Sequence, residues 1–321
     1  MSGFITVGIL QTALEVGLIY SLVTMSLFIS FSILDICDLS TDGCYTLGCA
    51  VGATVTIMGH PVFALFAAMG AGILSGFVTA ILQTRLGVQS ILAGIIVNTG
   101  LYTINLAVMG FSSNISIFGK DTVFSLVGGA FDLPFWKSWS RLILLFLILA
   151  VVCFVVWWFL GTRLGLSIRA TGDSSSMVRA SSINPAFTIT FGLCTANSLT
   201  GLAGALIGQY NKSCDINLGT GMVTIALASL IIGEMISVKR NMLLRVISVV
   251  IGSCLYRFVI SVALRLNVPT EAFKLVSALI VAVAIATPTG KEVIKRQLRK
   301  NALRKQTIQV CDGSTAKEGD Q

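Results

Sequence analysis

Residues 139–160 read WSRLILLFLILAVVCFVVWWFL, and this stretch decides the fold class. Arg141 is its only charged side chain. A helix that crosses about 30 Å of hydrocarbon needs about 20 mostly apolar residues, so the run is long enough to span a membrane. Over all 321 residues, 11% are charged and 55% are hydrophobic, whereas soluble proteins have about a quarter charged. So few charges cannot cover a water-exposed surface. We therefore predict an all-α polytopic membrane protein.

Apolar runs of similar length recur along the chain. They predict nine candidate spans, at residues 5–31, 42–58, 62–83, 88–110, 139–160, 187–208, 219–236, 242–266 and 273–287. The run at 219–236 is the weakest of these, and the first two could be pieces of one interrupted element. We expect about 8–10 transmembrane helices in one domain of residues 1–290, followed by a basic, flexible tail at 291–321.

The positions of the basic residues predict the orientation. Most of the 22 Lys and Arg residues fall at Arg85, within 161–186, within 237–245 and in the tail. Alternating spans place all four of these regions on one side, and the positive-inside bias makes that side cytoplasmic. The C-terminus would then be cytoplasmic and the N-terminus outside. The same bias explains the basic tail, so we expect no nucleic acid partner.

The link between the first two spans is acidic. ILDICDLSTDG carries Asp35, Asp38 and Asp42 without any Lys or Arg, although alternation assigns it to the cytoplasm. Acidic residues count little toward orientation. The link could instead be irregular backbone at membrane depth, which is tolerated where it lines a cavity. The sequence leaves both interpretations open.

Polar side chains inside apolar spans mark either a solute pathway or a hydrogen bond between helices. Asn98 and Asn105 are seven residues apart and therefore share one helix face. For these two and for Asn197, both interpretations stay open. Glu15 is a stronger pathway candidate, because an ionised carboxylate in lipid needs a partner or water. Asp42 is a further acidic candidate.

Other features of the spans predict packing and surface contacts. Glu234 is expected to pair with Lys239 and Arg240 at the interface, while Arg257 and Arg265 extend toward the outer face. Glycine pairs at Gly-x-x-x-Gly spacing predict close packing within the chain rather than a dimer face. These pairs are Gly48 and Gly52, Gly72 and Gly76, and Gly204 and Gly208.

Motifs for catalysis and metal binding are missing from the sequence. There is no GxxxxGK[ST] phosphate loop, no HExxH and no CxxC pair. The single histidine, His60, cannot complete a Cys/His zinc site. We therefore expect neither an enzyme nor a metal or cofactor in this chain.

The most informative polar stretch is GTRLGLSIRATGDSSSMVRASSINPAF, from Gly161 to Phe187. Asp173 or Ser174 can cap a short helix that runs to about Ile183, before Pro185 limits it. Such a helix suits docking into a groove of a soluble partner, with Met177 and Ile183 as apolar anchors and Arg179 setting orientation. The alternative is a simple loop that obeys the charge bias.

Within this stretch, GLSIRATGDSSSMVRASSIN (165–184) resembles the cytoplasmic coupling segment of ABC-importer permeases of the branched-chain amino acid and ribose type. The resemblance continues through ILDICDLSTDGCYTLGCAVGA (33–53), LQTRLGVQSILAGIIVNTGLYTINLAVMG (82–110) and GALIGQYNKSCDINLGTGMVTIALASLIIGE (204–234), then VIGSCLYRFVISVALRLNV (250–268). Together these stretches cover most of residues 10–290. The chain looks most similar to the subgroup that works with receptors of the tryptophan/tyrosine-binding kind.

The resemblance implies ABC-importer transmembrane-domain architecture, with the cytoplasmic coupling segment 161–186 touching a separate ATPase subunit. The matching contact positions are Gly165, Arg169, Ala170, Gly172, Asp173, Met177 and Arg179. Ser174 and Ser182 depart from the asparagine and glycine that we expect there, which leaves the local turn geometry open.

The same resemblance implies an assembly in a bacterial cytoplasmic membrane. It would contain two permease subunits as a homodimer, two ATPase subunits that bind ATP and Mg²⁺, and an extracytoplasmic substrate-binding protein or lipoprotein. This chain would itself hold no cofactor. The expected function is that of an importer permease subunit for a small solute, first tryptophan or tyrosine, then other amino acids, sugars or nucleosides. The alternatives are an ion-coupled secondary transporter, with Glu15 or Asp42 as the coupling carboxylate, and an intramembrane enzyme, which the missing motifs disfavour.

Overall fold

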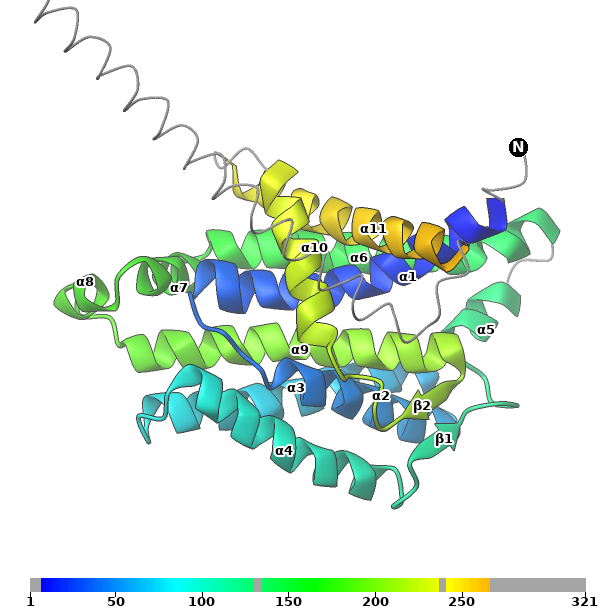
Figure 1. Cartoon of the computed structure of the whole chain (residues 1–321), viewed down its shortest axis with the longest axis horizontal. Helices are drawn as coiled ribbons and strands as arrows, with labels where there is room; N and C mark the ends of the chain where they lie inside the picture. The colour runs from blue at the N-terminus through cyan, green and yellow to red at the C-terminus, as the bar shows by residue number, and fades with distance from the viewer. Residues whose placement is uncertain (1–6, 130–133, 237–240, 266–321) are drawn as a thin grey trace, which may run out of the picture.

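The computed structural model describes residues 7–129, 134–236 and 241–265 (Figure 1). The predicted span 273–287 and the tail 291–321 lie outside the described residues, as do Lys239 and Arg240. The elements are α1 (Val7–Leu27), the π-helical turn η1 (Phe28–Ile33), α2 (Thr41–Ile57), α3 (Pro61–Thr84), α4 (Ser90–Val108), β1 (Asn114–Ser116), α5 (Val123–Gly129), α6 (Pro134–Gly161), α7 (Arg163–Asp173), α8 (Ser175–Ala180), α9 (Pro185–Asn211), β2 (Ser213–Asp215), α10 (Met222–Ile236) and α11 (Met242–Arg265).

The long helices run side by side in two layers. In Figure 1, α1, α6 and α11 form one layer, and α9, α3, α2 and α4 form the other, while α10 crosses at a steep angle. In the described part of the chain, six helices are long and apolar enough to cross a membrane, and they match six predicted spans. These are Leu10–Ile33, Pro61–Thr84, Ser90–Val108, Trp139–Gly161, Pro185–Asn211 and Met242–Ala263. The chain is an all-α polytopic membrane protein, as predicted.

Helix α2 is short and central. It has 17 residues, most of them buried, and it packs against α9, α3 and α4. The preceding helix α1 lies in the other layer (Figure 1), so the two are separate elements rather than one interrupted span. Most of α2 is covered by other helices rather than by lipid. Its neighbours therefore pack close to its backbone.

Glycines allow this close approach between α2, α3 and α9. Gly48 and Gly52 of α2 lie against Gly201 and Ala205 of α9, where an added Cβ atom would collide with the facing helix. The other two predicted pairs make the same kind of contact within the chain: Gly72 and Gly76 with Asn197 and Leu193, and Gly204 and Gly208 with Tyr45 and Cys49. The prediction of intramolecular packing is confirmed.

Two irregular segments, residues 34–40 and 216–221, precede α2 and α10. The first reaches the middle of α9, because the Asn197 side chain donates to Asp38, which is only 1% exposed. The second meets the first turn of α2, because the Gly221 amide donates to Asp42. Segment 34–40 therefore lies inside the protein at mid-length of α9, and segment 216–221 runs from the β1–β2 end to the start of α2. The burial of Asp38 favours the interpretation of this link as irregular backbone inside the protein, of the kind that is tolerated beside a cavity.

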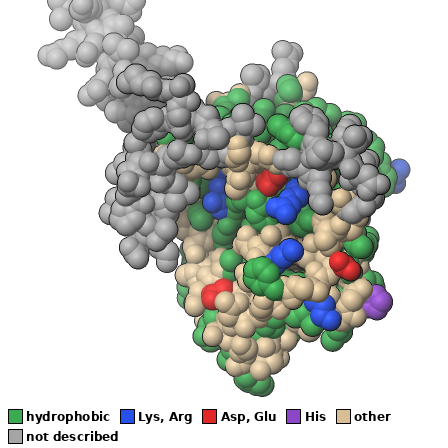
Figure 2. Space-filling model, turned by 90° about the vertical axis from the view of Figure 1, so that its right-hand side faces the viewer, with side chains coloured by type: hydrophobic (Ala, Val, Ile, Leu, Met, Phe, Trp, Pro, Cys, Tyr) green, Lys and Arg blue, Asp and Glu red, His purple; other side chains and the backbone are tan. Residues whose placement is uncertain are grey.

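The two ends of the helix bundle differ. Helices α7 and α8 lie at one end, and the antiparallel pair β1–β2 lies at the other with α5 (Figure 1). Figure 2 shows charged side chains of both signs on the β1–β2 end. At the α7 end, Arg85 shares a cavity with Asn184, and Arg245 contacts Ser32 at the end of α1. The basic links at Arg85, in 161–186 and at Arg245 thus lie at one end of the bundle.

Candidate functional site

Asp42 lies where two helices begin. It belongs to the first turn of α2, and it also receives the first amides of α10. The Val223 amide donates to Asp42 Oδ1 at 2.8 Å, and the Gly221 amide donates to Oδ2 at 3.0 Å. The N-terminal end of a helix carries partial positive charge, which stabilises a carboxylate. Asp42 therefore ties the irregular segment 216–221 to α2 and satisfies amides that have no partner within a helix.

A cavity of about 300 Å³ opens beside this junction. Its wall comes from the first turns of α2, one face of α4 and the segment 216–220. The lining residues are Asp42, Gly43, Thr46, Asn98, Thr99, Tyr102, Asn105, Ile216, Asn217, Gly219 and Thr220. Thr99 and Tyr102 are exposed, so the cavity opens along α4. Three of the five predicted pathway residues, Asp42, Asn98 and Asn105, thus line one cavity.

The two asparagines of α4 share a face, as their spacing predicts, and that face meets α2. Asn105 Nδ2 donates to the Gly43 carbonyl oxygen at 3.1 Å, and Asn98 Oδ1 lies next to the Gly43 Cα. Asn105 is 1% exposed, and its Oδ1 has no hydrogen-bond partner among the described residues. Asn105 therefore fits both predicted roles. Its Nδ2 forms a hydrogen bond between α4 and α2, and the residue also lines the cavity, with Oδ1 as an acceptor that has no partner in the described structure.

Asn197 lies in a different polar cluster. Its Nδ2 donates to Asp38 Oδ2 at 2.9 Å, while the Ser40 amide donates to Asp38 Oδ1 at 2.8 Å. Thr79 Oγ1 then donates to Ser40 Oγ at 3.2 Å, which links the cluster to α3. Asn197 thus bonds to the irregular segment 34–40 rather than to another helix, and it does not line the cavity described above.

Glu15 lies toward the opposite end of α1 from η1 and does not line that cavity. It is 3% exposed, and both of its oxygens have neutral partners. Gln11 Nε2 donates to Oε1 at 3.0 Å, and the Tyr210 hydroxyl donates to Oε2 at 2.9 Å. The sequence predicted that this carboxylate needs a partner. Gln11 of α1 and Tyr210 at the end of α9 are those partners.

The coupling segment forms two helices, α7 and α8, at the end that holds the basic links. Ser174 caps α8, because the Met177 amide donates to Ser174 Oγ at 3.4 Å. The helix ends at Ala180 rather than near Ile183, because Ser182 adopts a left-handed φ of 61°. A left-handed residue is where glycine is favoured, which explains why glycine was expected at this position.

The predicted coupling residues divide into two groups. Arg169, Asp173, Met177 and Arg179 are exposed, and Ala170 is partly exposed. Gly165 and Gly172 instead pack against the chain itself: Gly165 faces Leu160, and Gly172 faces the Ile33 carbonyl oxygen of η1. The two glycines therefore hold α7 close to α6 and η1, while the other positions face outward.

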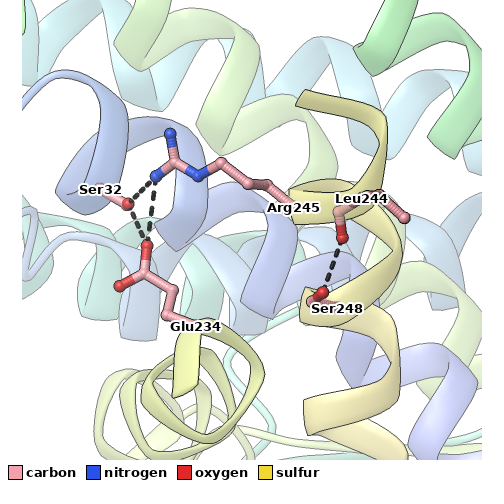
Figure 3. Close-up of polar contacts among 5 residues, drawn as sticks. All are labelled: Ser32, Glu234, Leu244, Arg245 and Ser248. Atoms are coloured by element: carbon pink, nitrogen blue, oxygen red, sulfur yellow. Dashed lines mark hydrogen bonds and ion pairs between the residues drawn. The ribbon is translucent and has the colours of Figure 1, made fainter. Parts of the chain in front are cut away.

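A polar contact joins η1 to α10 and α11 at the same end (Figure 3). Ser32 Oγ donates to Glu234, and the Arg245 guanidinium donates to Ser32 Oγ at 2.9 Å. Arg245 also pairs with Glu234 at 3.4 Å and lies 5.0 Å from the centre of the Phe28 ring. The expected partners Lys239 and Arg240 lie outside the described residues, and the partner that the structure shows is Arg245. Helix α7, η1 and α10 are thus in continuous contact.

Comparison of the sequence with known proteins shows its family. Residues 9–285 match the family model of the branched-chain amino acid transport system permease component. The chain belongs to this family. It is a permease component of an amino acid transport system, of the ABC type by family.

Two curated relatives align with nearly the whole permease. A tyrosine transport system permease protein of Clostridioides difficile (strain R20291) is 31% identical over 288 residues, which cover 89% of this chain and 92% of the relative. An uncharacterized protein of Rickettsia prowazekii (strain Madrid E) is 31% identical over 283 residues, which cover 87% of this chain and 97% of the relative. No solved structure matches the permease.

Several residues of the permease have roles that the sequence analysis missed. Thr46, Tyr102 and the segment 216–220 line the cavity, and the three acids of the 34–42 link were the available signal for this region. Arg257 was wrongly expected to extend to the outer face. Its guanidinium lies 3.6 Å from the centre of the Tyr20 ring, because a cation over an aromatic face is stabilised inside the bundle. The side chain of Arg265 lies outside what the structure describes.

Proposed function

We propose that this permease is the transmembrane subunit of a binding-protein-dependent importer, with α7 and α8 as the docking site of a separate ATPase. The main support is the outward-facing set Arg169, Asp173, Met177 and Arg179 on two capped helices at the basic end. Met177 is 64% exposed and offers an apolar anchor for docking of the helix into a groove of the partner.

The proposed mechanism requires two packings of the helices that are close in free energy, one open to each side of the membrane. ATP binding closes two ATPase subunits and draws the docked segments of two permease copies together. Gly172 transmits that movement to Ile33 of η1, and Ser32 transmits it to Glu234 of α10. Because α10 starts on Asp42, the movement reaches the cavity beside α4.

The proposed solute is an amino acid, with an aromatic one first, because a relative is named for tyrosine transport. An extracytoplasmic binding protein would deliver it, and the C-terminal tail would lie in the cytoplasm. ATP and Mg²⁺ would bind only to the ATPase subunits.

The test replaces Arg179 with glutamate in proteoliposomes that contain permease, ATPase and binding protein. Arg179→Glu should leave an inserted, folded permease that loses ATP-driven uptake and substrate-stimulated ATPase activity by at least tenfold, because the positive charge that sets the orientation of the docked helix is reversed. Lys120→Glu makes the same charge change on an exposed residue of the opposite end and should leave co-purification of the ATPase with the permease unchanged. Unaltered uptake by Arg179→Glu would refute the docking site. Uphill uptake by the permease alone, driven by an ion gradient, would instead establish the secondary-transporter alternative.

A further inference from the structure

The cavity beside Asp42 has a chemical character that the family match does not specify. Its lining offers hydrogen-bond acceptors and one negative charge, and no Lys or Arg lines it among the described residues. We propose that this cavity is a solute-binding site within the permease, which recognises the primary ammonium group of the transported amino acid through Asn105 Oδ1 and the Asp42 carboxylate. The inference rests on the proposed function in taking the solute to be an amino acid.

Asn105 supplies the most specific part of the argument. Its side chain is almost fully buried, and the Oδ1 atom has no partner in the described structure. The bond from Nδ2 to the Gly43 carbonyl fixes the orientation of the amide, because a flipped amide would place two acceptor oxygens against each other. A buried acceptor without a partner is unfavourable, and Asn105 differs from the other buried acceptors without a partner in lining the cavity, where a water or a donor of the solute can satisfy it.

Asp42 supplies the charge. Each carboxylate oxygen receives one amide from the start of α10 and keeps further lone-pair capacity for another donor. An ammonium group has three donors and no acceptor, which fits a site with a carboxylate and an unused amide oxygen. A carboxylate of the solute would be repelled by Asp42 and is expected to point away from this wall.

The remaining lining suits the rest of a small amphipathic solute. The volume of about 300 Å³ lies at the lower end of the range for small-molecule pockets, which is roughly 300–1,000 Å³. Tyr102 and Ile216 provide apolar surface, and the Tyr102 ring can also attract a cation. The cavity opens along α4 at the exposed Thr99, which leaves room for the other end of the solute.

The experiment measures binding to the purified permease in lipid nanodiscs, without ATPase or binding protein. The probes are L-tyrosine, tyramine, which lacks the carboxylate, and 3-(4-hydroxyphenyl)propionate, which lacks the amine. Tyrosine and tyramine should bind with Kd values within about threefold of each other, because both present the ammonium group. The propionate should bind at least tenfold more weakly. This comparison uses the unaltered permease and does not depend on the folding of a variant.

Variants then locate the site. Asn105→Leu has similar volume but no acceptor, and it should weaken tyramine binding at least tenfold while the thermal unfolding profile shows a folded protein. Thr103→Val, on the same helix but not in the cavity lining, should bind tyramine like the unaltered permease.

Equal binding of propionate and tyramine would overturn the inference, as would an unchanged Kd in folded Asn105→Leu or no binding of any probe. ATP-driven tyrosine uptake by the complete system tests the proposed function separately. ATP-driven uptake without the predicted probe preference would support the proposed importer function and refute only the proposed binding site.

Discussion

Replacing Gly76 of α3 with alanine should push α3 and α9 apart. A Cβ atom at Gly76 would lie 2.6 Å from the Leu193 carbonyl oxygen and 3.0 Å from the Cys194 Cα. Both are backbone atoms, so no side-chain rotation can relieve the collision, and the helices must separate. Overpacking of this kind costs about 1–3 kcal/mol. The gain in helix propensity from glycine to alanine, about 1 kcal/mol, opposes it.

Gly70 of the same helix is the matched control, since an added Cβ there has no neighbour within 4 Å. Gly70→Ala gains the same helix propensity without the collision. The difference between the two variants should therefore be about 1–3 kcal/mol in the free energy of unfolding, with Gly76→Ala the less stable. Reversible unfolding by sodium dodecyl sulfate in mixed micelles measures this difference. Equal free energies for the two variants would refute the close packing of α3 on α9.

Two further predictions concern the α7 end of the bundle. Ser182→Gly should raise the free energy of unfolding by up to about 1 kcal/mol, because the left-handed φ of 61° is unfavourable for serine. Ser181→Gly, at a φ of −86°, should lower the free energy of unfolding. The opposite order of the two variants would contradict the strained turn. Glu234→Gln should change the free energy of unfolding by less than about 1 kcal/mol, because the ion pair with Arg245 is partly exposed, at 39% and 26%. A loss above about 2 kcal/mol in the same unfolding titration would show that this contact is far stronger than its exposure allows.

The spans could be predicted because each depends on its own residues. A run such as 139–160 is apolar enough to define a helix without knowledge of its neighbours. The cap of α8 is local in the same way, since Ser174 accepts from an amide three residues later. The shared face of Asn98 and Asn105 likewise follows from helix geometry alone.

The junction at the cavity could not be predicted, because it joins distant parts of the chain. Asp42 meets the amides of Gly221 and Val223, and Asp38 meets Asn197, across most of the sequence. Local composition records only that acids are present in the 34–42 link. It does not record which amides they receive, and so Asn197 and Asn105 could not be assigned to different clusters before the structure placed them.

The enclosure of α2 has a consequence for biosynthesis. This helix is too short to cross the bilayer comfortably, and its principal neighbour α9 is synthesised only after α3 to α8. At about 5–20 residues per second, that delay is on the order of ten seconds. During it, the bundle lacks the main neighbour of this short helix, and Asp42 at its start waits still longer for the amides of Gly221 and Val223. The insertion machinery, with α3 and α4, must enclose α2 until both α9 and the start of α10 have been synthesised.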